Sequence, residues 1–249
     1  GHRRLSIIDL TTGDQPMQDN EGNWITYNGE IYNYIELREE LGNQRFHTSS
    51  DTEVILQAYR KWGKDCVHHL RGMFSFALWD EKEKALFCAR DRFGIKPFYY
   101  TVVNDVFYFA SEAKALLPFV KSIETDLDGL KEYLAFQFCL GEKTLFKGIK
   151  QLLPAHTLMI KNGRLIIEKY WEVFFTHDWH HTEQYFEEKL RSLLDDSVQV
   201  HLRSDVPLGA YISGGLDSST IASLASLRKQ SAEPLIGFTG KFSKYGQSY

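Results

Sequence analysis

The sequence predicts an α+β domain followed by the beginning of an α/β domain. In the first half, short runs of β-branched and aromatic residues cluster without regular alternation with helical patterns. Such clustering is typical of antiparallel sheets with helices packed on their faces. Towards the end of the chain, a strand pattern leads through a glycine-rich turn into a helix pattern, which is typical of an α/β domain.

The strand candidates of the first half are short and have the composition that pleated, half-buried surfaces prefer. They are RLSIIDL at 4–10, WITY at 24–27, MFSFALW at 73–79, ALFCA at 85–89 and VFYFA at 106–110. Two helix patterns lie between them, and each ends before a glycine, as helices often do. The first ends before Gly42, and the second, at residues 54–62, ends before Gly63.

A hairpin is expected to close the first domain. The runs HTLMI and RLIIE flank Asn162-Gly163, a dipeptide that supplies the positive φ angles of a type I′ turn. The following stretch, from 174 to 182, is polar and histidine-rich, so we expect a linker there. These features predict a first domain at residues 1–173 and a second at 182–249, which opens on a helix whose apolar residues recur every four positions.

Composition and charge exclude several classes of function. The chain has 249 residues, of which 43% are hydrophobic and 25% charged, so it can bury a sizeable core in one or two domains. The formal net charge of -4 gives no basic field that would attract nucleic acid or an anionic membrane surface. No run approaches the roughly 18 apolar residues of a membrane span. We therefore expect small-molecule partners, and neither nucleic acid nor a membrane.

The cysteines predict neither a disulfide framework nor a zinc site. Cys66, Cys88 and Cys139 are odd in number, far apart and outside any CxxC spacing. A reducing cytoplasm is therefore the expected location. The chain begins at Gly1, directly before a strand pattern, and we expect an upstream piece to belong to the protein.

The segment SGGLDSS, residues 213–219, carries the strongest chemical signal. It follows the strand candidate LGAYI and precedes the helix candidate TIASLASL, so backbone N–H groups and the positive end of a helix dipole meet at one point. Glycines let the backbone approach an anion closely, and serines can donate hydroxyl hydrogen bonds. The residues expected to bind pyrophosphate are Ser213, Gly214, Gly215, Ser218 and Ser219.

Asp217, inside this segment, predicts a bound cation. Its charge repels phosphate, so its expected task is to hold a Mg²⁺ ion that bridges phosphate oxygens. The lysine of a Walker A loop is missing from the segment, which argues against a P-loop phosphoryl transferase. The alternative is that the segment is only a turn followed by a serine N-cap, but the flanking strand and helix favour the phosphate site.

Several motifs together resemble one enzyme family. SGGLDSS resembles the pyrophosphate loop of ATP pyrophosphatases. Six blocks of the first half resemble, in order, those of class II glutaminase domains: RLSIIDL (4–10), YNGEIYN (27–33), SDTEVIL (50–56), RGMFSFALWD (71–80), ARDRFGIKPFYY (89–100) and ASEAKALL (110–117). The combination is similar to the glutamine-hydrolysing asparagine synthetases. It implies an N-terminal-nucleophile-type αββα sandwich followed by the start of an ATP-pyrophosphatase-type domain.

The resemblance also implies a reaction. ATP with Mg²⁺ would adenylate the side chain of aspartate, and ammonia released from glutamine would attack the β-aspartyl-AMP to give asparagine. Glutamine, aspartate and ATP are the implied substrates, and a homodimer is left open. The alternatives are a related amidotransferase that acts on another carboxylate, a β-lactam-synthetase-like enzyme without glutaminase function, and a non-catalytic binding module of the same fold. The intact charged residues argue against the last two.

Residues of the first blocks are candidates for a glutamine pocket. Arg4 offers a planar fork that suits an α-carboxylate, and by resemblance it is the carboxylate clamp. Ile8 is expected to lend backbone groups to the same ligand. Glu30 and Asp51 are acids suited to the α-ammonium group. By resemblance, the Asn28 amide and the Gly29 N–H form an oxyanion hole.

Each candidate in this pocket has a plainer alternative. Asp51 directly precedes a helix pattern and could be its N-cap. Asn28-Gly29 could be a type I′ hairpin turn. Arg4 could be a surface arginine beside Asp9.

The sequence also departs from the family. The family nucleophile is an N-terminal cysteine whose own amine is the base, and no cysteine here matches it. Cys66 and Cys88 are expected to be core thiols, the nucleophile is expected upstream of Gly1, and the chain alone is not expected to hydrolyse glutamine. By resemblance, Ile212 and Gly240 border the nucleotide, although Gly240 stands where the family has a larger apolar residue.

Overall fold

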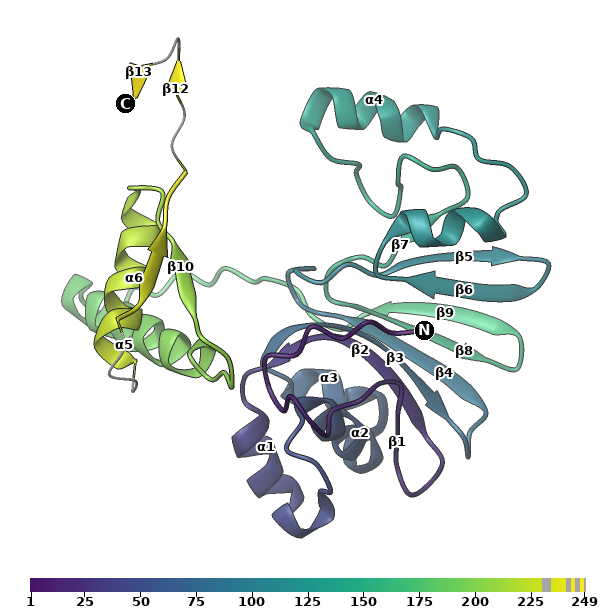
Figure 1. Cartoon of the computed structure of the whole chain (residues 1–249), viewed down its shortest axis with the longest axis horizontal. Coiled ribbons are helices and arrows are strands. Elements are labelled where there is room, and N and C mark those ends of the chain that lie inside the picture. The colour runs from purple at the N-terminus through teal and green to yellow at the C-terminus, as the bar shows by residue number, and fades with distance from the viewer. Residues whose placement is uncertain (230–233, 241–242, 245–246, 249) are drawn as a thin grey trace. The chain divides into compact units, whose positions relative to one another are not determined.

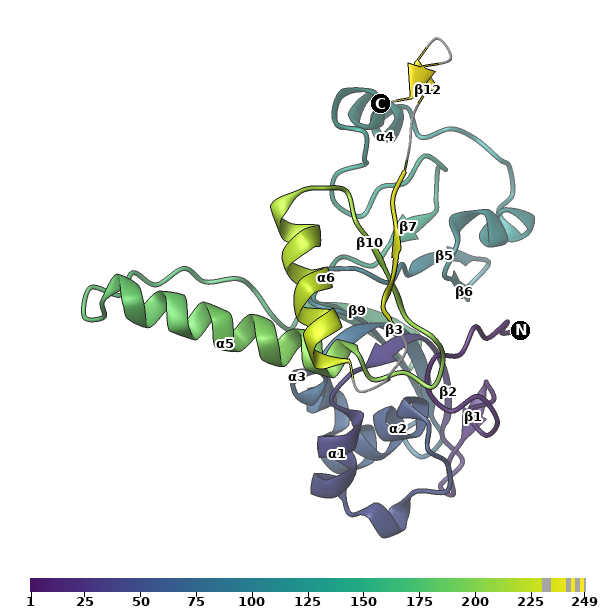
Figure 2. The ribbon, with the colours of Figure 1, turned by 60° about the vertical axis from the view of Figure 1, so that its left-hand side comes forward.

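The computed structural model describes residues 1–229, 234–240, 243–244 and 247–248. The chain divides into two compact units, Gly1–Phe174 and Phe175–Tyr249. Figures 1 and 2 show the elements of each unit from two directions.

The first unit is built on two antiparallel sheets. The larger sheet has the strand order β1-β2-β3-β4-β8-β9, and the smaller has the order β6-β5-β7 (Figure 1). The strands of the larger sheet are β1 Met17–Gln18, β2 Trp24–Ile31, β3 Gly72–Asp80, β4 Ala85–Arg90, β8 His156–Lys161 and β9 Arg164–Lys169. Those of the smaller sheet are β5 Tyr99–Val103, β6 Val106–Ala110 and β7 Lys150–Gln151. The strands expected from WITY, MFSFALW, ALFCA and VFYFA are confirmed as parts of β2, β3, β4 and β6.

Helices cover the outer face of the larger sheet. They are α1 (Tyr34–Leu41), α2 (Asp51–Trp62) and α3 (Cys66–His69), with the 3₁₀ turns η1 (Asn43–Arg45) and η2 (Gly63–Asp65) beside them. Ile55 of α2 shares one buried cluster with Phe74 and Phe76 of β3. The alternation of side chains along a strand explains why Ala77, between Phe76 and Leu78, belongs to the cluster on the opposite face.

The two sheets pack against each other through that second cluster. Ala77 and Cys88 of the larger sheet meet Phe98 and Tyr100 at the smaller one. On the far side of the smaller sheet lies η3 (Ala113–Phe119), and its Phe119 ring stacks on Tyr108 with centroids 4.4 Å apart. Helix α4 (Leu127–Phe136) follows along the chain. The expected helix–sheet–sheet–helix order is confirmed, with a short 3₁₀ helix as its outer layer.

Local turn chemistry sets several boundaries as expected. Helix α1 ends before Gly42 (φ 93°) and α2 before Gly63 (φ 59°), and each glycine N–H donates to a carbonyl of the last helical turn. The hairpin between β8 and β9 turns at Asn162 (φ 53°) and Gly163 (φ 71°), so the type I′ prediction is confirmed.

The expected strand at residues 4–10 is wrong. This segment has no regular secondary structure and ends in a turn at Asp9, whose φ is 54°. The Asp9 carboxylate accepts hydrogen bonds from the backbone N–H groups of Thr11 and Thr12, which bends the chain where a strand would continue. Ile8 is buried, whereas Leu5 is 90% exposed, so the apolar alternation of the sequence does not reflect a sheet face here.

The second unit begins as the expected α/β domain. Thr182 caps α5 (Glu183–His201), and β10 (Gly209–Tyr211) and β11 (Ile236–Phe238) pair in parallel on either side of α6 (Leu216–Arg228) along the chain. Arg228 of α6 forms an ion pair with Asp195 of α5, with Nε 2.6 Å from Oδ1. The parallel crossover is the unit from which α/β sheets are built.

The end of the chain is described in part. Two-residue strands β12 (Ser243–Lys244) and β13 (Gln247–Ser248) pair with each other. The run IGFTGKF, residues 236–242, begins as β11, and its last two residues, Lys241 and Phe242, lie outside the described residues. None of the helices in the described ranges is long and apolar enough to cross a bilayer.

Candidate functional site

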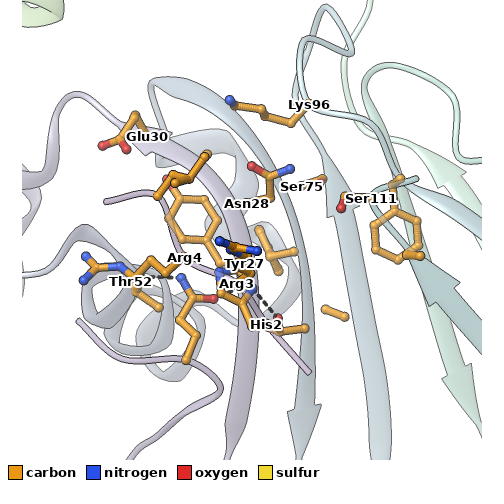
Figure 3. A pocket seen from close by; sticks show the side chains of 18 of the residues that line it. His2, Arg3, Arg4, Tyr27, Asn28, Glu30, Thr52, Ser75, Lys96 and Ser111 are labelled. Carbon is orange, nitrogen blue, oxygen red and sulfur yellow. Dashed lines mark hydrogen bonds between the residues drawn. The ribbon is translucent and has the colours of Figure 1, made fainter. Parts of the chain in front are cut away.

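A cavity of about 790 Å³ in the first unit collects most of the residues expected to bind glutamine. Its walls come from the N-terminal segment, β2, the start of α2, β3, the loop before β5 and the end of β6. Five candidates line it: Arg4, Asn28, Gly29, Glu30 and Asp51. Figure 3 shows Arg4, Asn28 and Glu30 around this space. Residues up to 47 positions apart in the sequence therefore share one site.

Asn28 and Gly29 lie in the middle of a strand. Along β2, Asn28 pairs with Ser75 and Gly29 with Phe74 of β3, so the alternative of a hairpin turn is wrong. A Cβ atom on Gly29 would lie 2.1 Å from the carbonyl oxygen of Met73, which leaves room for glycine alone. The close approach of β3 therefore explains the glycine, and the pairing holds the Asn28 side chain at the cavity wall (Figure 3).

Asp51 is the first residue of α2, and the N-cap is Ser50. The Ser50 hydroxyl accepts the backbone N–H of Thr52, so the alternative that Asp51 caps the helix is wrong. The Asp51 carboxylate is 3% exposed and instead accepts the Tyr27 hydroxyl at 2.8 Å and the Ile31 N–H at 2.9 Å. These two donors hold the acid beside β2.

Burial controls the ionisation of this acid. Desolvation raises the pKa of Asp51 from its ordinary 3.8, although the hydrogen bonds from Ile31 and Tyr27 and the charge of Arg4 oppose the rise. Burial and the neighbouring Asp51 likewise raise the pKa of the Tyr27 hydroxyl, which stays a hydrogen-bond donor. An ammonium group placed in the cavity would favour the Asp51 anion.

Arg4 is held by the backbone of its own segment. Its Nη1 donates to the carbonyl of Asp9 and its Nη2 to the carbonyl of Ile8, each at 2.6 Å. Gly13 makes this possible, because a Cβ there would lie 2.3 Å from the guanidinium. The arginine lines the cavity and is partly buried, unlike the surface residue of the alternative. A guanidinium has five N–H donors, so donors remain for a ligand.

Ile8 is placed differently from the other candidates. Its side chain is 3% exposed and does not line the cavity, and its carbonyl oxygen accepts from Arg4. A direct contact between Ile8 and glutamine stays a prediction.

Other residues of the cavity wall were not singled out from the sequence. Gln15 accepts the Tyr27 N–H with its side-chain oxygen at 2.6 Å, which ties the N-terminal segment to β2. Lys96, Ser75 and Ser111 also line the cavity (Figure 3). Lys96 lies in the quoted block ARDRFGIKPFYY, and a cation within that aromatic run was the available signal.

The aromatic run FGIKPFYY, residues 93–100, lies only partly in the sheet core. Phe98 and Tyr100 are buried, but Phe93 is 70% and Ile95 60% exposed. The cause is Asp91, a buried acid whose carboxylate accepts the N–H groups of residues 93, 95 and 96 and folds them into a loop. This loop presents Lys96 to the cavity.

The glycine-rich segment of the second unit lies between β10 and α6, as expected. Gly215 is the N-cap of α6 and no side chain caps the helix, so the alternative of a serine N-cap is wrong. Gly214 has φ 81°, and the hydroxyls of Ser213 and Ser218 lie 3.1 Å apart across the turn. The segment is largely exposed, and Asp217 lies in the first turn of the helix.

Ile212 and Gly240 come just after the carboxyl ends of the two parallel strands, at the same end of the small sheet. The Ile212 N–H donates to the Phe238 carbonyl at 2.8 Å, and Gly240 comes two residues after β11. Ligands of α/β sheets bind at the carboxyl ends of parallel strands. Both residues therefore lie at the same end of this sheet as the glycine-rich segment.

The described residues contain no group of three or more His, Cys, Asp or Glu side chains that could hold a metal ion. Asp217 is the acid of the glycine-rich segment. Mg²⁺ is usually held by one or two carboxylates together with substrate phosphates, so a single acid fits such an ion.

The cysteines are placed as expected from the sequence. Cys66 and Cys88 are fully buried in the two core clusters, and burial raises the pKa of both thiols. Cys139 is partly buried. All three lie in the described part of the chain, and none lines the cavity. Buried thiols with a raised pKa are unreactive, and the burial of Cys66 and Cys88 confirms them as core residues.

Comparisons with known proteins agree with this arrangement. The model of the glutamine amidotransferase domain family matches residues 1–171, and that of the asparagine synthase family matches residues 189–248. Since the first match covers more than half of the sequence, the chain belongs to the glutamine amidotransferase domain family.

Curated relatives extend the likeness across both units. Asparagine synthetase [glutamine-hydrolyzing] 1 of Bacillus subtilis is 45% identical in an alignment of 229 residues, and the match covers 90% of this chain and 36% of that protein. Asparagine synthetase [glutamine-hydrolyzing] 3 of the same organism is 44% identical over 94% of this chain and 40% of that protein. Amidase chyE of Penicillium rubens is 36% identical over 92% of this chain and 35% of that protein. The chain thus spans well under half the length of these relatives.

Proposed function

We propose that this chain supplies the glutamine-binding site and the first part of the ATP site of a glutamine-dependent asparagine synthetase. The observation that carries the proposal is the cavity that joins Arg4, Asn28, Gly29, Glu30 and Asp51. A cation, two acids and an amide around one space match the groups of an amino acid that ends in a carboxamide. The names of the relatives and the asparagine synthase match in the second unit support the same reaction.

Glutamine binds with its charged end between Arg4 and the two acids. The donors of Arg4 that do not hold Ile8 and Asp9 bind the α-carboxylate. Asp51 and Glu30 receive the α-ammonium group. Both charged groups of a zwitterion placed this way meet an opposite charge, which favours glutamine over ligands that carry only one of the two charges.

The carboxamide of glutamine extends toward the middle of β2. During hydrolysis its carbonyl oxygen becomes negatively charged, and the Asn28 amide and the Gly29 N–H donate to it. These donors are fixed by the pairing of β2 with β3, so they need no rearrangement as the charge develops. The attacking group is the predicted upstream cysteine.

The second unit binds ATP at the edge formed by β10 and β11. Backbone N–H groups of the turn and the hydroxyls of Ser213, Ser218 and Ser219 bind the phosphates, and Ile212 and Gly240 border the nucleotide. Asp217 would hold Mg²⁺, which neutralises phosphate charge when it is bound. Adenylation gives the aspartate side chain a leaving group that ammonia can displace.

A related amidotransferase acting on another carboxylate is the second candidate. The match to a fungal protein named an amidase favours this second candidate. The chain covers 35% of that protein and 36% of the first synthetase, so it matches similar shares of two relatives with different names. The two candidates share both sites described here, and they differ in the acid that is adenylated.

Pyrophosphate exchange into ATP by the intact protein separates the candidates. Labelled pyrophosphate enters ATP only when an acid is adenylated reversibly, so aspartate is offered alone and against a panel of other carboxylates. Exchange that requires aspartate supports asparagine synthesis. Exchange with another acid supports the second candidate, and no exchange with any acid refutes ligase function.

A further inference from the structure

The turn at residues 9–12 is built around a buried acid that sequence patterns leave without a role. The Asp9 side chain is 6% exposed, and its backbone is left-handed at φ 54°. Its Oδ1 accepts the N–H groups of Thr11 at 3.2 Å and Thr12 at 2.8 Å, and its Oδ2 also accepts the Thr12 hydroxyl. A buried carboxylate needs such donors to stay ionised.

The backbone of this turn holds one end of the amino-acid pocket. The Asp9 carbonyl accepts Arg4 Nη1, and the preceding carbonyl, of Ile8, accepts Nη2. Two neighbouring carbonyls thus fix the plane of the guanidinium, and Gly13 leaves the room that it needs. A change in the turn would displace the group that we assign to the α-carboxylate.

The side chain of Asp9 also contacts the loop before α2, whose first residue, Asp51, lines the pocket. The Asp9 Oδ2 accepts the N–H of Ser49 at 2.9 Å, across 40 residues of sequence. Ser50 follows as the N-cap of α2, and Asp51 is the first residue of that helix. The carboxylate of Asp9 is therefore two peptide units from the acid assigned to the α-ammonium group.

A second acid secures the same connection from inside α2. The Glu53 carboxylate accepts the N–H groups of His47 and Thr48, and also the Thr48 hydroxyl at 2.7 Å. The loop from 47 to 50 is thus held by Asp9 on one side and by the helix on the other. Because this loop is fixed at both sides, a shift of the turn at residues 9–12 would also shift the start of α2.

We propose that Asp9 is a positioning residue that sets the separation between Arg4 and Asp51, and with it the recognition of an α-amino acid. Asp9 does not line the cavity, so it acts through these two residues and touches no ligand. A zwitterion binds well only if both of its charges meet their partners at the same time. The inference rests on the proposed function and deepens it.

Asp9→Asn tests the proposal with little change of backbone. Asparagine tolerates the left-handed conformation and keeps one carbonyl acceptor, but its amide nitrogen cannot accept the Ser49 N–H. Glutamine binding by the full chain, measured by isothermal titration calorimetry, should weaken by at least about tenfold, as expected for a lost bond to a charged group. Thr12→Ala is the matched control, because it removes a donor to Asp9 and leaves Ser49 in place, and it should stay within about threefold.

A comparison of two ligands separates positioning from general structural support. Glutaramic acid is glutamine without the α-amino group, and the wild-type chain should bind it more weakly than glutamine. In Asp9→Asn this preference should fall by at least about fivefold, because the acceptor of the ammonium group is displaced. A merely structural role would weaken both ligands by the same factor. Asp9→Gly is the second variant, to be measured if Asp9→Asn does not fold. Glycine tolerates the positive φ, and it removes both carboxylate acceptors.

The outcomes distinguish this inference from the proposed function. A reduced preference for glutamine over glutaramic acid in the Asp9 variants supports the positioning role. Wild-type binding of glutamine with an unchanged preference in the variants overturns the inference and leaves the glutamine site intact. A wild-type chain that binds neither ligand overturns the proposed glutamine site, and the inference with it.

Discussion

Asp51 shows how burial prepares a single residue for an amine ligand. Its carboxylate is almost completely buried, and burial raises its pKa although two hydrogen bonds and the charge of Arg4 favour the anion. Such a group gains when a further positive charge is placed beside it. In the proposed complex the α-ammonium group of glutamine supplies that charge, so that glutamine binding and the ionisation of Asp51 are linked.

This linkage predicts a pH dependence of binding. Glutamine affinity should fall as pH is lowered through the pKa of Asp51, which lies above the ordinary 3.8 because of burial. Titration calorimetry from about pH 8 to about pH 4 measures it. Asp51→Asn should bind glutamine at least about tenfold more weakly at neutral pH and without this dependence. A wild-type affinity that stays constant over the whole range would contradict the assignment.

The same pKa predicts a sign for stability. A carboxyl whose pKa is raised on folding costs stability while it is ionised, and that cost disappears as pH falls through the folded pKa. Asp51→Asn should therefore be at least as stable as the wild type near pH 7, and its advantage should shrink toward about pH 4. Urea unfolding at both pH values tests this. A variant that is less stable at neutral pH and recovers in acid would show that the anion is favourable.

At the scale of the element, the pairing of β2 with β3 fixes the two residues that we propose as oxyanion donors. Asn28 and Gly29 are both fixed by β3, and β3 approaches Gly29 too closely for any side chain. The two residues proposed as oxyanion donors therefore lie on a strand whose position is fixed by its neighbour. Loops that could move under strain are not involved in their placement.

Gly29→Ala should lower the free energy of unfolding by about 3 kcal/mol, because the added methyl group overlaps with the backbone of β3. Asn28→Ala is the matched control on the same strand, since it shortens a side chain at the cavity wall and should change stability by less than about 1 kcal/mol. Urea denaturation measures both. Equal stabilities for the two variants would mean that β3 can move away from β2.

Patterns with a local cause predicted elements well. Glycine after α1 and α2, Asn162-Gly163 between β8 and β9, and the aromatic runs of β3 all depend on neighbouring residues, and each is found in the structure. These signals need no knowledge of distant contacts. The layers of the first unit followed from them.

Features that depend on distant partners could not be predicted from the sequence. The apolar pattern in residues 4–10 suggests a strand, but the chain turns at Asp9, whose carboxylate accepts the N–H of Ser49, 40 residues away. The choice of Ser50 as the N-cap of α2 becomes visible only when Asp51 is seen to bind Tyr27. The access of Lys96 to the cavity depends on the loop that Asp91 organises, and Asp91 in turn accepts the N–H of Phe74, 17 residues away in β3.

At the scale of the whole molecule, the two sites belong to separate units. The amino-acid cavity lies within residues 1–174, and the glycine-rich segment lies within 175–249. Substitutions at one site are therefore expected to leave ligand binding at the other unchanged.

Asp217→Asn tests this independence. The variant should reduce pyrophosphate exchange by the intact protein at least about tenfold, because the carboxylate that would hold Mg²⁺ is lost. Its affinity for glutamine should equal that of the wild type. Ser219→Ala is a milder variant, since it removes one hydroxyl donor and keeps the charge. Unchanged exchange in Asp217→Asn would remove this acid from the ATP site.

The most direct test of the account is glutamine binding by the chain itself. Titration calorimetry should show one glutamine bound per chain, and Arg4→Lys should weaken it at least about tenfold, because a lysine lacks the planar fork that fits a carboxylate. Such a result would establish the cavity as a glutamine site. No binding of glutamine, or an affinity that neither Arg4→Lys nor Asp51→Asn changes, would contradict the account.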